Sequence, residues 1–402
     1  MDSARTRRLI WSAPRQDWLR ESEPSSAALV DRLLNMATIG LPGMQLPDGT
    51  VCFTRRFSAD GDVAPPEGRS LRYTAISLLG ARHLDKDMQI HALAGRTAAQ
   101  GCDNLVAQLS TTASVGDAAL VVWAAAALKH EGLEPALARL DALDAGAGPR
   151  YVVELAWILA ALVAARSAVD VEGRIERTRS RLLDSLVGTR QLFGHVTGPG
   201  LVPRYRSHVG CFADQVYPIQ ALARLHASVG DAEALAVANR CAEQICALQG
   251  GAGQWWWHYD SRTGEVVEGY PVYSVHQHAM APMALLDLAE AGGRSESAAI
   301  RRGLAWMVDA PEVSEPLMLD GPGLTVRKAA RNDPRKLVRG VRAATTSVRP
   351  GLRLSALDRL YPPIEVDREC RPYEFGWMLD CWLGGVDTIG RTEPPVADAE
   401  RR

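Results

Sequence analysis

The sequence predicts an all-α protein built from alternating inner and outer helices, and three observations lead to this prediction. Apolar residues recur with helical periodicity along most of the chain, whereas the alternation typical of strands is scarce. Segments that are apolar on nearly every side alternate with segments that carry a charged face. A related motif also recurs in two of the apolar segments. Because a helix that is apolar all round is buried and one with a charged face covers the outside, we expect inner and outer helix pairs.

Six segments are expected to form the inner helices because charged residues are rare in them. They are 72–84, 117–128, 151–165, 212–226, 274–291 and 373–383. The segments between them carry more charge and are expected to form outer helices. They are 86–109, 171–187, 231–248 and 294–308.

The recurring motif indicates that the helix pairs are stacked units. Pro218-Ile219 and Pro282-Met283 each lie a few residues into an inner segment, and each is followed by an Ala-Leu pair. Self-similarity of this kind marks repeated supersecondary units. Six pairs that close on themselves would form an (α/α)6 toroid as a single domain over residues 1–402, with one central cavity. An open α-solenoid is the alternative, but polar groups at the same end of each inner helix favour the closed ring.

Two segments fall outside the helical pattern. Residues 46–72 contain Phe53, Phe57 and Pro65-Pro66 and are expected to form an irregular or hairpin cap. Residues 322–352 form the strongly basic stretch, which is either a solvated helix with a flexible loop or a lid. As a lid, it could also dock on a phosphate-bearing or lipid-headgroup partner, which would give peripheral membrane contact.

Composition narrows the partners and the compartment. A net charge of −2 supplies no overall field for nucleic acid, so no nucleic-acid partner is expected. The seven cysteines show no zinc-ligand spacing and are expected to be free thiols in a reducing compartment. No apolar signal region precedes Pro14, and no run of about 18 apolar residues is present. These features predict a cytoplasmic location and leave the oligomeric state open.

Aromatic and histidine residues are densest between residues 254 and 278. Tryptophan and tyrosine offer flat faces with a polar edge, and histidine exchanges a proton near neutral pH. The turn at 260–265 would return the chain to Val266-Val267 as a hairpin above the cavity. The stretch is therefore either one wall of a site for a polar ligand or an aromatic plug. Its candidate residues are Trp255, Trp256, Trp257, His258, Tyr259, Tyr270, Tyr273, His276, Gln277 and His278.

Other polar residues stand at the starts of the remaining inner helices. They are Arg72, Tyr73, Asp117, Glu154, Asp214, Gln215, Tyr217, Tyr373 and Glu374, with Trp377 one turn later. Asp117 follows Gly116 and is expected to cap its helix. A helix N-terminus favours the ionised form of an acid, so Asp214 and Glu374 are expected to act as bases or hydroxyl acceptors. A proton donor would then be an acid in an apolar niche, a tyrosine or a histidine.

The candidates divide into two roles. Catalytic candidates are Asp214, Glu374, His276, His278 and Tyr217, with Glu154 in reserve. Substrate-binding candidates are Trp255, Trp256, Trp257, His258, Tyr259, Tyr270, Tyr273, Gln215, Gln277, Tyr373, Trp377 and Tyr73. The spacing of His276 and His278 is a weak metal signal, and no metal or other cofactor is expected.

The helix pairs, together with the aromatic loop Gln254-Trp255-Trp256-Trp257-His258-Tyr259-Asp260, resemble the six-hairpin glycosidase-like superfamily. Its toroids include glycoside hydrolases, sugar epimerases of the acylglucosamine type and polysaccharide lyases. The resemblance covers most of the chain as architecture and carries no single family's catalytic signature. It implies a carbohydrate or glycoconjugate substrate. An isoprenoid-cyclase-like toroid is an alternative whose Asp-x-Asp-Asp motif is absent, and the zinc-ligand pattern of lanthionine cyclases is also missing.

Three functions follow from these residues. In a hydrolase, Asp214 and Glu374 would flank the scissile bond. In an epimerase or lyase, His276, His278, Tyr217 or Tyr273 would remove a proton. The non-catalytic alternative is a sugar-binding or scaffold protein of glycan assembly, working at the membrane through residues 322–352. The enzyme readings require Trp256, His276, Asp214 and Glu374 to line one cavity.

Overall fold

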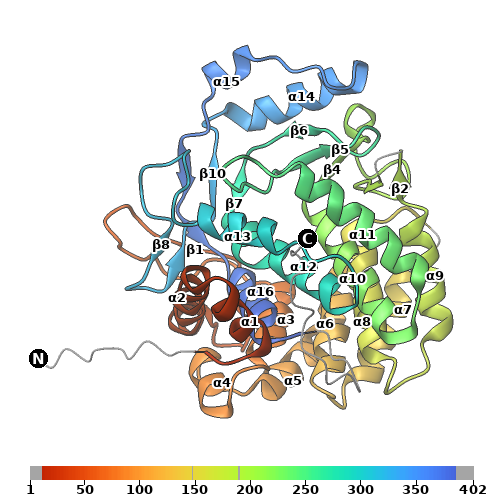
Figure 1. The fold of residues 1–402 in the computed structure, drawn as a ribbon. Helices are drawn as coiled ribbons and strands as arrows, with labels where there is room; N and C mark the ends of the chain where they lie inside the picture. The colour runs from red at the N-terminus through yellow and green to blue at the C-terminus, as the bar shows by residue number, and fades with distance from the viewer. Residues whose placement is uncertain (1–10, 147, 189–190, 386–402) are drawn as a thin grey trace, which may run out of the picture.

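Six buried helices form a closed ring in the computed structural model, which describes residues 11–146, 148–188 and 191–385. Each helix packs against the next, and the last packs against the first, so the ring closes (Figure 1). The members are α3 (Leu71–Ala81), α6 (Val115–Ala127), α8 (Val152–Ala165), α10 (Ala213–Val229), α12 (Ala281–Glu290) and α16 (Pro372–Leu383). The protein is an (α/α)6 toroid, and all six predicted inner helices are confirmed.

A second layer of helices surrounds this ring. The outer helices are α2 (Pro24–Gly40), α5 (Ala98–Gln108), α7 (Leu133–Asp144), α9 (Glu172–Leu183), α11 (Ala232–Ala247) and α13 (Ser297–Trp306). The predicted helix 86–109 is divided into α4 (Lys86–Ala92) and α5, because Ala94 and Gly95 adopt left-handed φ values that a helix cannot continue. Sequence analysis did not identify α1 (Pro14–Ser22), α2 or α7.

A single proline shapes the start of α12. The π-helical turn η4 (His276–Met280) leads into this helix, and Pro282 follows. Pro282 has no N–H to donate to the carbonyl of His278, four residues earlier. The indole N–H of Trp382 on α16 donates to that carbonyl instead, at 2.8 Å. The gap in the helix thus becomes a link between neighbouring inner helices.

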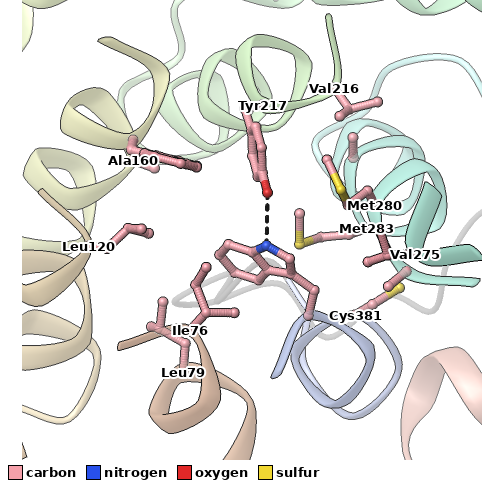
Figure 2. Close-up of a cluster of buried hydrophobic side chains, with 14 of the residues drawn as sticks. Ile76, Leu79, Leu120, Ala160, Val216, Tyr217, Val275, Met280, Met283 and Cys381 are labelled. Carbon is pink, nitrogen blue, oxygen red and sulfur yellow. Dashed lines mark hydrogen bonds between the residues drawn. The ribbon is translucent and has the colours of Figure 1, made fainter. Parts of the chain in front are cut away.

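The middle of the ring is a packed core rather than a channel. Figure 2 shows Ile76, Leu79, Leu120, Met280 and Met283 converging from the inner helices. In their midst the indole N–H of Trp377 donates to the hydroxyl of Tyr217 at 2.8 Å, which satisfies two polar groups that the core encloses. These two candidate site residues therefore form the floor beneath any cavity at the helix starts.

Charged residues close the carboxyl ends of the inner helices. The fully buried Asp287 on α12 pairs with Arg15 of α1 and, at 2.6 Å, with Arg224 of α10. Asp380 on α16 lies 3.3 Å from Arg82 and 3.7 Å from Arg224. Because this end is sealed by ion pairs, the opposite end of the ring is the one that can admit a ligand.

Short strands and two helices cover the open end. The predicted hairpin is present, with β5 (His258–Asp260) paired to β6 (Val266–Glu268) and β4 (Val209–Cys211) on its other side. A second sheet has the order β11 (Glu365–Asp367), β10 (Lys328–Ala330), β7 (Val272–Tyr273). Helices α14 (Leu337–Val348) and α15 (Ala356–Leu360) lie beyond the hairpin at the top of Figure 1.

The remaining short elements complete the cap. The paired strands are β1 (Arg55–Arg56) with β12 (Glu369–Cys370), β2 (Leu186–Val187) with β3 (Leu192–Phe193), and β8 (Met318–Leu319) with β9 (Leu324–Thr325). The other short helices are η1 (Leu41–Met44), η2 (Leu109–Thr111), η3 (Arg204–Arg206) and η5 (Pro334–Lys336). Residues 46–72 form isolated bridges around β1, in keeping with the irregular cap expected there.

Two further expectations concern the whole chain. All seven cysteines lie in the described ranges and are free thiols, as their spacing predicted. Within those ranges, none of the helices combines the length and the apolar character that crossing a membrane requires.

Candidate functional site

Acidic residues stand in the first turns of four inner helices at the open end of the ring, which we call the mouth. They are Asp117 on α6, Glu154 on α8, Asp214 on α10 and Glu374 on α16. The exposed N–H groups of a helix start favour a negative charge there. The surroundings of each acid differ, however, and decide what it can do.

Asp214 is fully buried and paired with a histidine that sequence analysis missed. Its Oδ2 accepts the backbone N–H of Cys211 at 2.6 Å and lies 2.8 Å from Nδ1 of His195, while Oδ1 has no partner among the described residues. His195 follows β3, and its carbonyl accepts the N–H of Val152 at the start of α8. The loop is thereby fixed between α8 and α10, with the imidazole against the carboxylate.

The pair favours a protonated imidazole. Burial alone would lower the pKa of His195, but the Asp214 carboxylate outweighs burial and raises it. The His195 side chain is 26% exposed, and its Nε2 makes no hydrogen bond to the described residues. His195 can therefore present a proton to a ligand while Asp214 holds the other side of the ring.

The same place contains the donor atoms of a metal site. One atom each from His195, Cys211 and Asp214 lies within 4.8 Å of the others, and such a set can hold zinc. Arg206, however, is close enough for its charge to oppose protonation of His195. A nearby guanidinium opposes a bound cation as well, and the hydrogen bonds to Asp214 account for the arrangement without one.

A hollow of about 400 Å³ opens beside α3 and α6 and contains Arg72, Tyr73 and Asp117 in its wall. Nε of Arg72 donates to Asp117 at 2.9 Å, and the guanidinium lies 4.9 Å from the centre of the Trp157 ring. The cap of α6 is Ser114, whose hydroxyl accepts the N–H of Asp117, so Asp117 is not the cap we expected. Its carboxylate instead accepts from Arg72 and, at 3.4 Å, from the hydroxyl of Thr112 in the wall of the hollow.

Tyr73 and Tyr373 join the first and last inner helices at the mouth. Their ring centres are 4.7 Å apart, and Phe53 stacks on Tyr73 from the cap at 5.4 Å. The Tyr73 hydroxyl accepts from Arg371 at 3.0 Å. These rings supply a flat aromatic wall next to the hollow.

The three consecutive tryptophans point in different directions. Trp255 is fully buried against Phe212, and Trp256 packs edge-on against Tyr270. Trp257 stacks on His276 at 5.7 Å and lies 4.8 Å from the ring of Tyr273. Of the three, Trp257 is the one in contact with the Tyr273 side of the mouth.

The clustered histidines are buried and neutral. Burial lowers the pKa of His276 to about 3 and that of His278 to about 3, and it holds the pKa of His258 well below its usual value. None of the three is a proton donor near neutral pH. In the strand register His258 lies opposite Cys211, next to the His195 and Asp214 pair.

Glu374 does not behave as its helix position suggests. It is fully buried, and its Oε2 accepts from the hydroxyl of Thr325 on β9 at 3.3 Å. Burial raises the pKa of Glu374 to about 8, even though Arg327 and Arg371 oppose this shift. The expected ionised form is therefore wrong near neutral pH, because desolvation exceeds the effect of the helix N-terminus.

Several other candidates have structural partners. Gln215 bonds both backbone groups of Phe193, and Gln277 donates to the carbonyl of Tyr273. Tyr270 donates to Glu312 at 2.9 Å. Tyr259 is buried among core residues, where burial raises its pKa. His276 packs against Phe212, two residues before Asp214, while Trp256 packs against Tyr270 and Glu374 accepts from Thr325. The expectation that these four residues line one cavity stays a prediction.

Positive charge remains uncompensated at the mouth. Arg206 on η3 and Arg339 on α14 both lie close enough to His258 to help lower its pKa, after the larger effect of burial. Neither forms an ion pair with any residue in the described part of the chain. Arg327, by contrast, pairs with Glu369 and also lies over the ring of Tyr273.

Comparison with known proteins shows the fold. No family model matches the chain, and no curated protein matches it. A solved unsaturated glucuronyl hydrolase specific for heparin is similar over 91% of this chain and 96% of its own, with 14% identity and a TM-score of 0.55.

Two further structures give the same result. The unsaturated glucuronyl hydrolase from Streptococcus agalactiae is similar over 93% of this chain and 96% of its own, with 9% identity and a TM-score of 0.56. A glycosyl hydrolase of family 88 from Bacteroides vulgatus is similar over 89% of this chain and 98% of its own, with 10% identity and a TM-score of 0.54. At these identities the likeness establishes a shared (α/α)6 toroid.

Proposed function

We propose that the protein is a glycoside hydrolase that acts at the mouth of the toroid. The observation that carries this proposal is the His195 and Asp214 pair, in which a carboxylate at the start of α10 raises the pKa of the imidazole beside it. Tyr73 and Tyr373 on one side, and Trp257 beside Tyr273 on another, offer aromatic faces on which a sugar ring can stack. The solved structures of the same fold are named as hydrolases of glucuronyl groups, which supports the assignment.

The proposed substrate carries negative charge. Arg206 and Arg339 bring unpaired cations to the mouth, next to His258. A guanidinium recognises carboxylate and sulfate groups through paired hydrogen bonds. A uronic acid or a sulfated sugar would satisfy both arginines, and the heparin specificity named for one similar structure agrees with this class.

The proposed reaction uses a proton donor and a separate base. Nε2–H of His195 gives its proton to the glycosidic oxygen as the bond to the anomeric carbon breaks, and Asp214 stabilises the imidazolium beforehand. Glu154 is the proposed base. It shares a helix face with Trp157, three residues later, and is half-buried without a partner among the described residues. Glu154 takes a proton from water while the water oxygen bonds to the anomeric carbon.

The epimerase and lyase readings have less support. Both need a base beside a carbonyl or carboxylate, and the sequence candidates were His276, His278, Tyr217 and Tyr273. The two histidines have a pKa of about 3, which makes them weak bases. Burial raises the pKa of both tyrosines, which disfavours their ionised forms.

The test is hydrolysis of a panel of glucuronyl, sulfated and neutral oligosaccharides, followed by chromatography of the products. We expect cleavage of an acidic member and a loss of about 10²–10⁴-fold in kcat for His195→Gln. Glu374→Gln is the matched control, because Glu374 faces β9, and it should retain the wild-type rate. Cleavage confined to neutral sugars would contradict the proposed substrate, and an undiminished rate in His195→Gln would contradict the proposed donor.

A further inference from the structure

The segment 335–364 presents apolar side chains to solvent at the outermost layer of the molecule, and we call its outward side the outer cap face. It comprises α14, α15 and the loops around them, at the top of Figure 1. Val348 is 86% exposed, Leu360 69% and Ile364 66%. Leu337 and Leu354 of the same segment are also exposed. Large apolar residues gathered on one exposed segment mark an interaction surface rather than ordinary scatter.

The same segment is strongly basic. It holds seven Lys or Arg residues and one acidic residue, although the whole chain has a net charge of −2. Its acid, Asp358, is already bonded to Arg331 and Arg342. Arg335, Arg349 and Arg359 are exposed and form no ion pair with the described residues. The outer cap face therefore carries positive charge that no carboxylate in the described chain neutralises.

The inward side of this segment already packs against the rest of the protein. Ala343 of α14 packs against Val209 and Val267 of the hairpin sheet. The buried Glu268 of β6 pairs with Arg342 at 2.9 Å and with Arg331 at 3.2 Å. Because these contacts already fix α14 on the hairpin, the exposed apolar residues are not needed to complete the core.

We propose that the outer cap face docks on an anionic phospholipid membrane. Such a surface accepts apolar side chains at the acyl boundary and basic side chains among the headgroups, so it matches both features. A second copy on the same face would oppose like charges across a two-fold axis. Nucleic acid would pair with the arginines but leave Val348, Leu360 and Ile364 without a partner.

The test is co-sedimentation of the purified chain with vesicles of phosphatidylcholine, with and without about a third phosphatidylserine. We expect binding to the anionic vesicles that weakens as salt is raised. Each cation near the surface contributes about five-fold in partitioning, so the triple variant Arg335→Ser, Arg349→Ser, Arg359→Ser should bind about 100-fold more weakly. The matched control is Lys86→Ser, Arg177→Ser, Arg240→Ser on other exposed surfaces, which should bind like the wild type.

A second variant separates docking from charge attraction alone. Val348→Ser, Leu360→Ser and Ile364→Ser together keep every charge and should still lose most of the binding. The proposal is overturned if anionic vesicles are not bound at low salt, or if neutral vesicles are bound equally well. It is also overturned if either outer-cap triple binds like the control, or if the apolar triple converts a dimer in solution to a monomer. Circular dichroism of each variant confirms that the chain is folded.

Discussion

His195 and Asp214 illustrate how a pair of side chains can set a reaction's pH range. The carboxylate raises the pKa of His195 by stabilising its charged form. If His195 is the proton donor, kcat/KM should fall as the pH rises through that pKa, above its usual value of about 6.5. Asp214→Asn removes the stabilising charge. We expect the falling limb to move to lower pH and the maximum rate to drop.

The measurement is kcat/KM against pH for the wild type and for Asp214→Asn, on whichever acidic glycan the enzyme cleaves. Glu374→Gln provides the control, because it replaces an acid of another inner helix, bonded to Thr325, and does not touch His195. Its falling limb should coincide with that of the wild type. An identical limb in all three proteins would show that the donor is another group.

Glu374 makes stability depend on pH in the opposite sense from most carboxylates. Burial raises its pKa to about 8, from 4.5 when unfolded. The stabilisation is therefore fully present below about pH 4.5 and is lost as the pH rises towards 8, by an amount on the order of a few kcal/mol. Glu374→Gln mimics the protonated form. Thermal unfolding should show a wild-type Tm that falls between pH 5 and 8, while the variant changes less.

The comparison for that measurement is Glu233→Gln, an exposed residue of α11. It should follow the wild type across the pH range. A Tm for Glu374→Gln that decreased with pH as steeply as the wild type would mean that Glu374 is already ionised in the folded protein.

Residue roles were harder to predict than residue positions. Asp214 was recognised because it begins an apolar helix, and it does lie at the mouth. His195 gave no comparable signal. It lies 19 residues before Asp214, just after a two-residue strand, and only the folded chain brings the two side chains together. Trp256 was selected for local density, but successive residues in the extended segment point to opposite sides. Sequence density therefore located the segment and not the side that faces the ligand.

The helices of the inner ring could be predicted because a helix that is buried on all sides is composed almost entirely of apolar residues. In α6 and α8 nearly every residue is apolar, so neither element needed tertiary information. The outer helix α7 was not predicted because it buries only a narrow apolar stripe between charged residues. The stripe consists of Leu133, Ala136, Leu137 and Leu140. The hairpin β5–β6 was anticipated from its turn.

Helix α14 is held by a buried ionic cluster. Arg342 reaches Glu268 at 2.9 Å and Asp358 at 2.7 Å. Arg342→Met would remove one partner of the fully buried Glu268, at a cost of about 3–5 kcal/mol. Since α14 packs mainly on η3 and β6, this loss should loosen α14 and leave the toroid folded. Limited proteolysis should then cleave within 335–364 far faster than in the wild type.

Arg349→Met, at the residue that directly follows α14, is the control, because Arg349 is exposed and lies outside the cluster. Its digestion rate should match the wild type. Equal rates for both variants would indicate that the apolar contacts of Ala343 hold α14 in place without the ionic cluster.

On the scale of the whole molecule, the ring has one sealed end and one open end. The seal depends on residues far apart in the sequence, because α1 brings Arg15 to α12 and α16. Its guanidinium pairs with Asp287 and Glu290 and donates to the carbonyl of Cys381. No local pattern in the first 23 residues predicts that Arg15 makes these contacts, because its partners come together only when the ring has closed.

Replacing Arg15 tests whether this seal stabilises the closed ring. Arg15→Met keeps the apolar stem and removes the charge, so Asp287 keeps Arg224 but loses its second cation. Breaking a buried pair costs about 3–5 kcal/mol, whereas an exposed pair such as Arg20 with Asp17 contributes about 0–1 kcal/mol. Urea unfolding should therefore show a much lower midpoint for Arg15→Met than for Arg20→Met. Since Arg15 is buried, added salt should leave that difference in place. Equal midpoints would mean that the ring closes through apolar packing around Trp377 and that the ionic seal adds little.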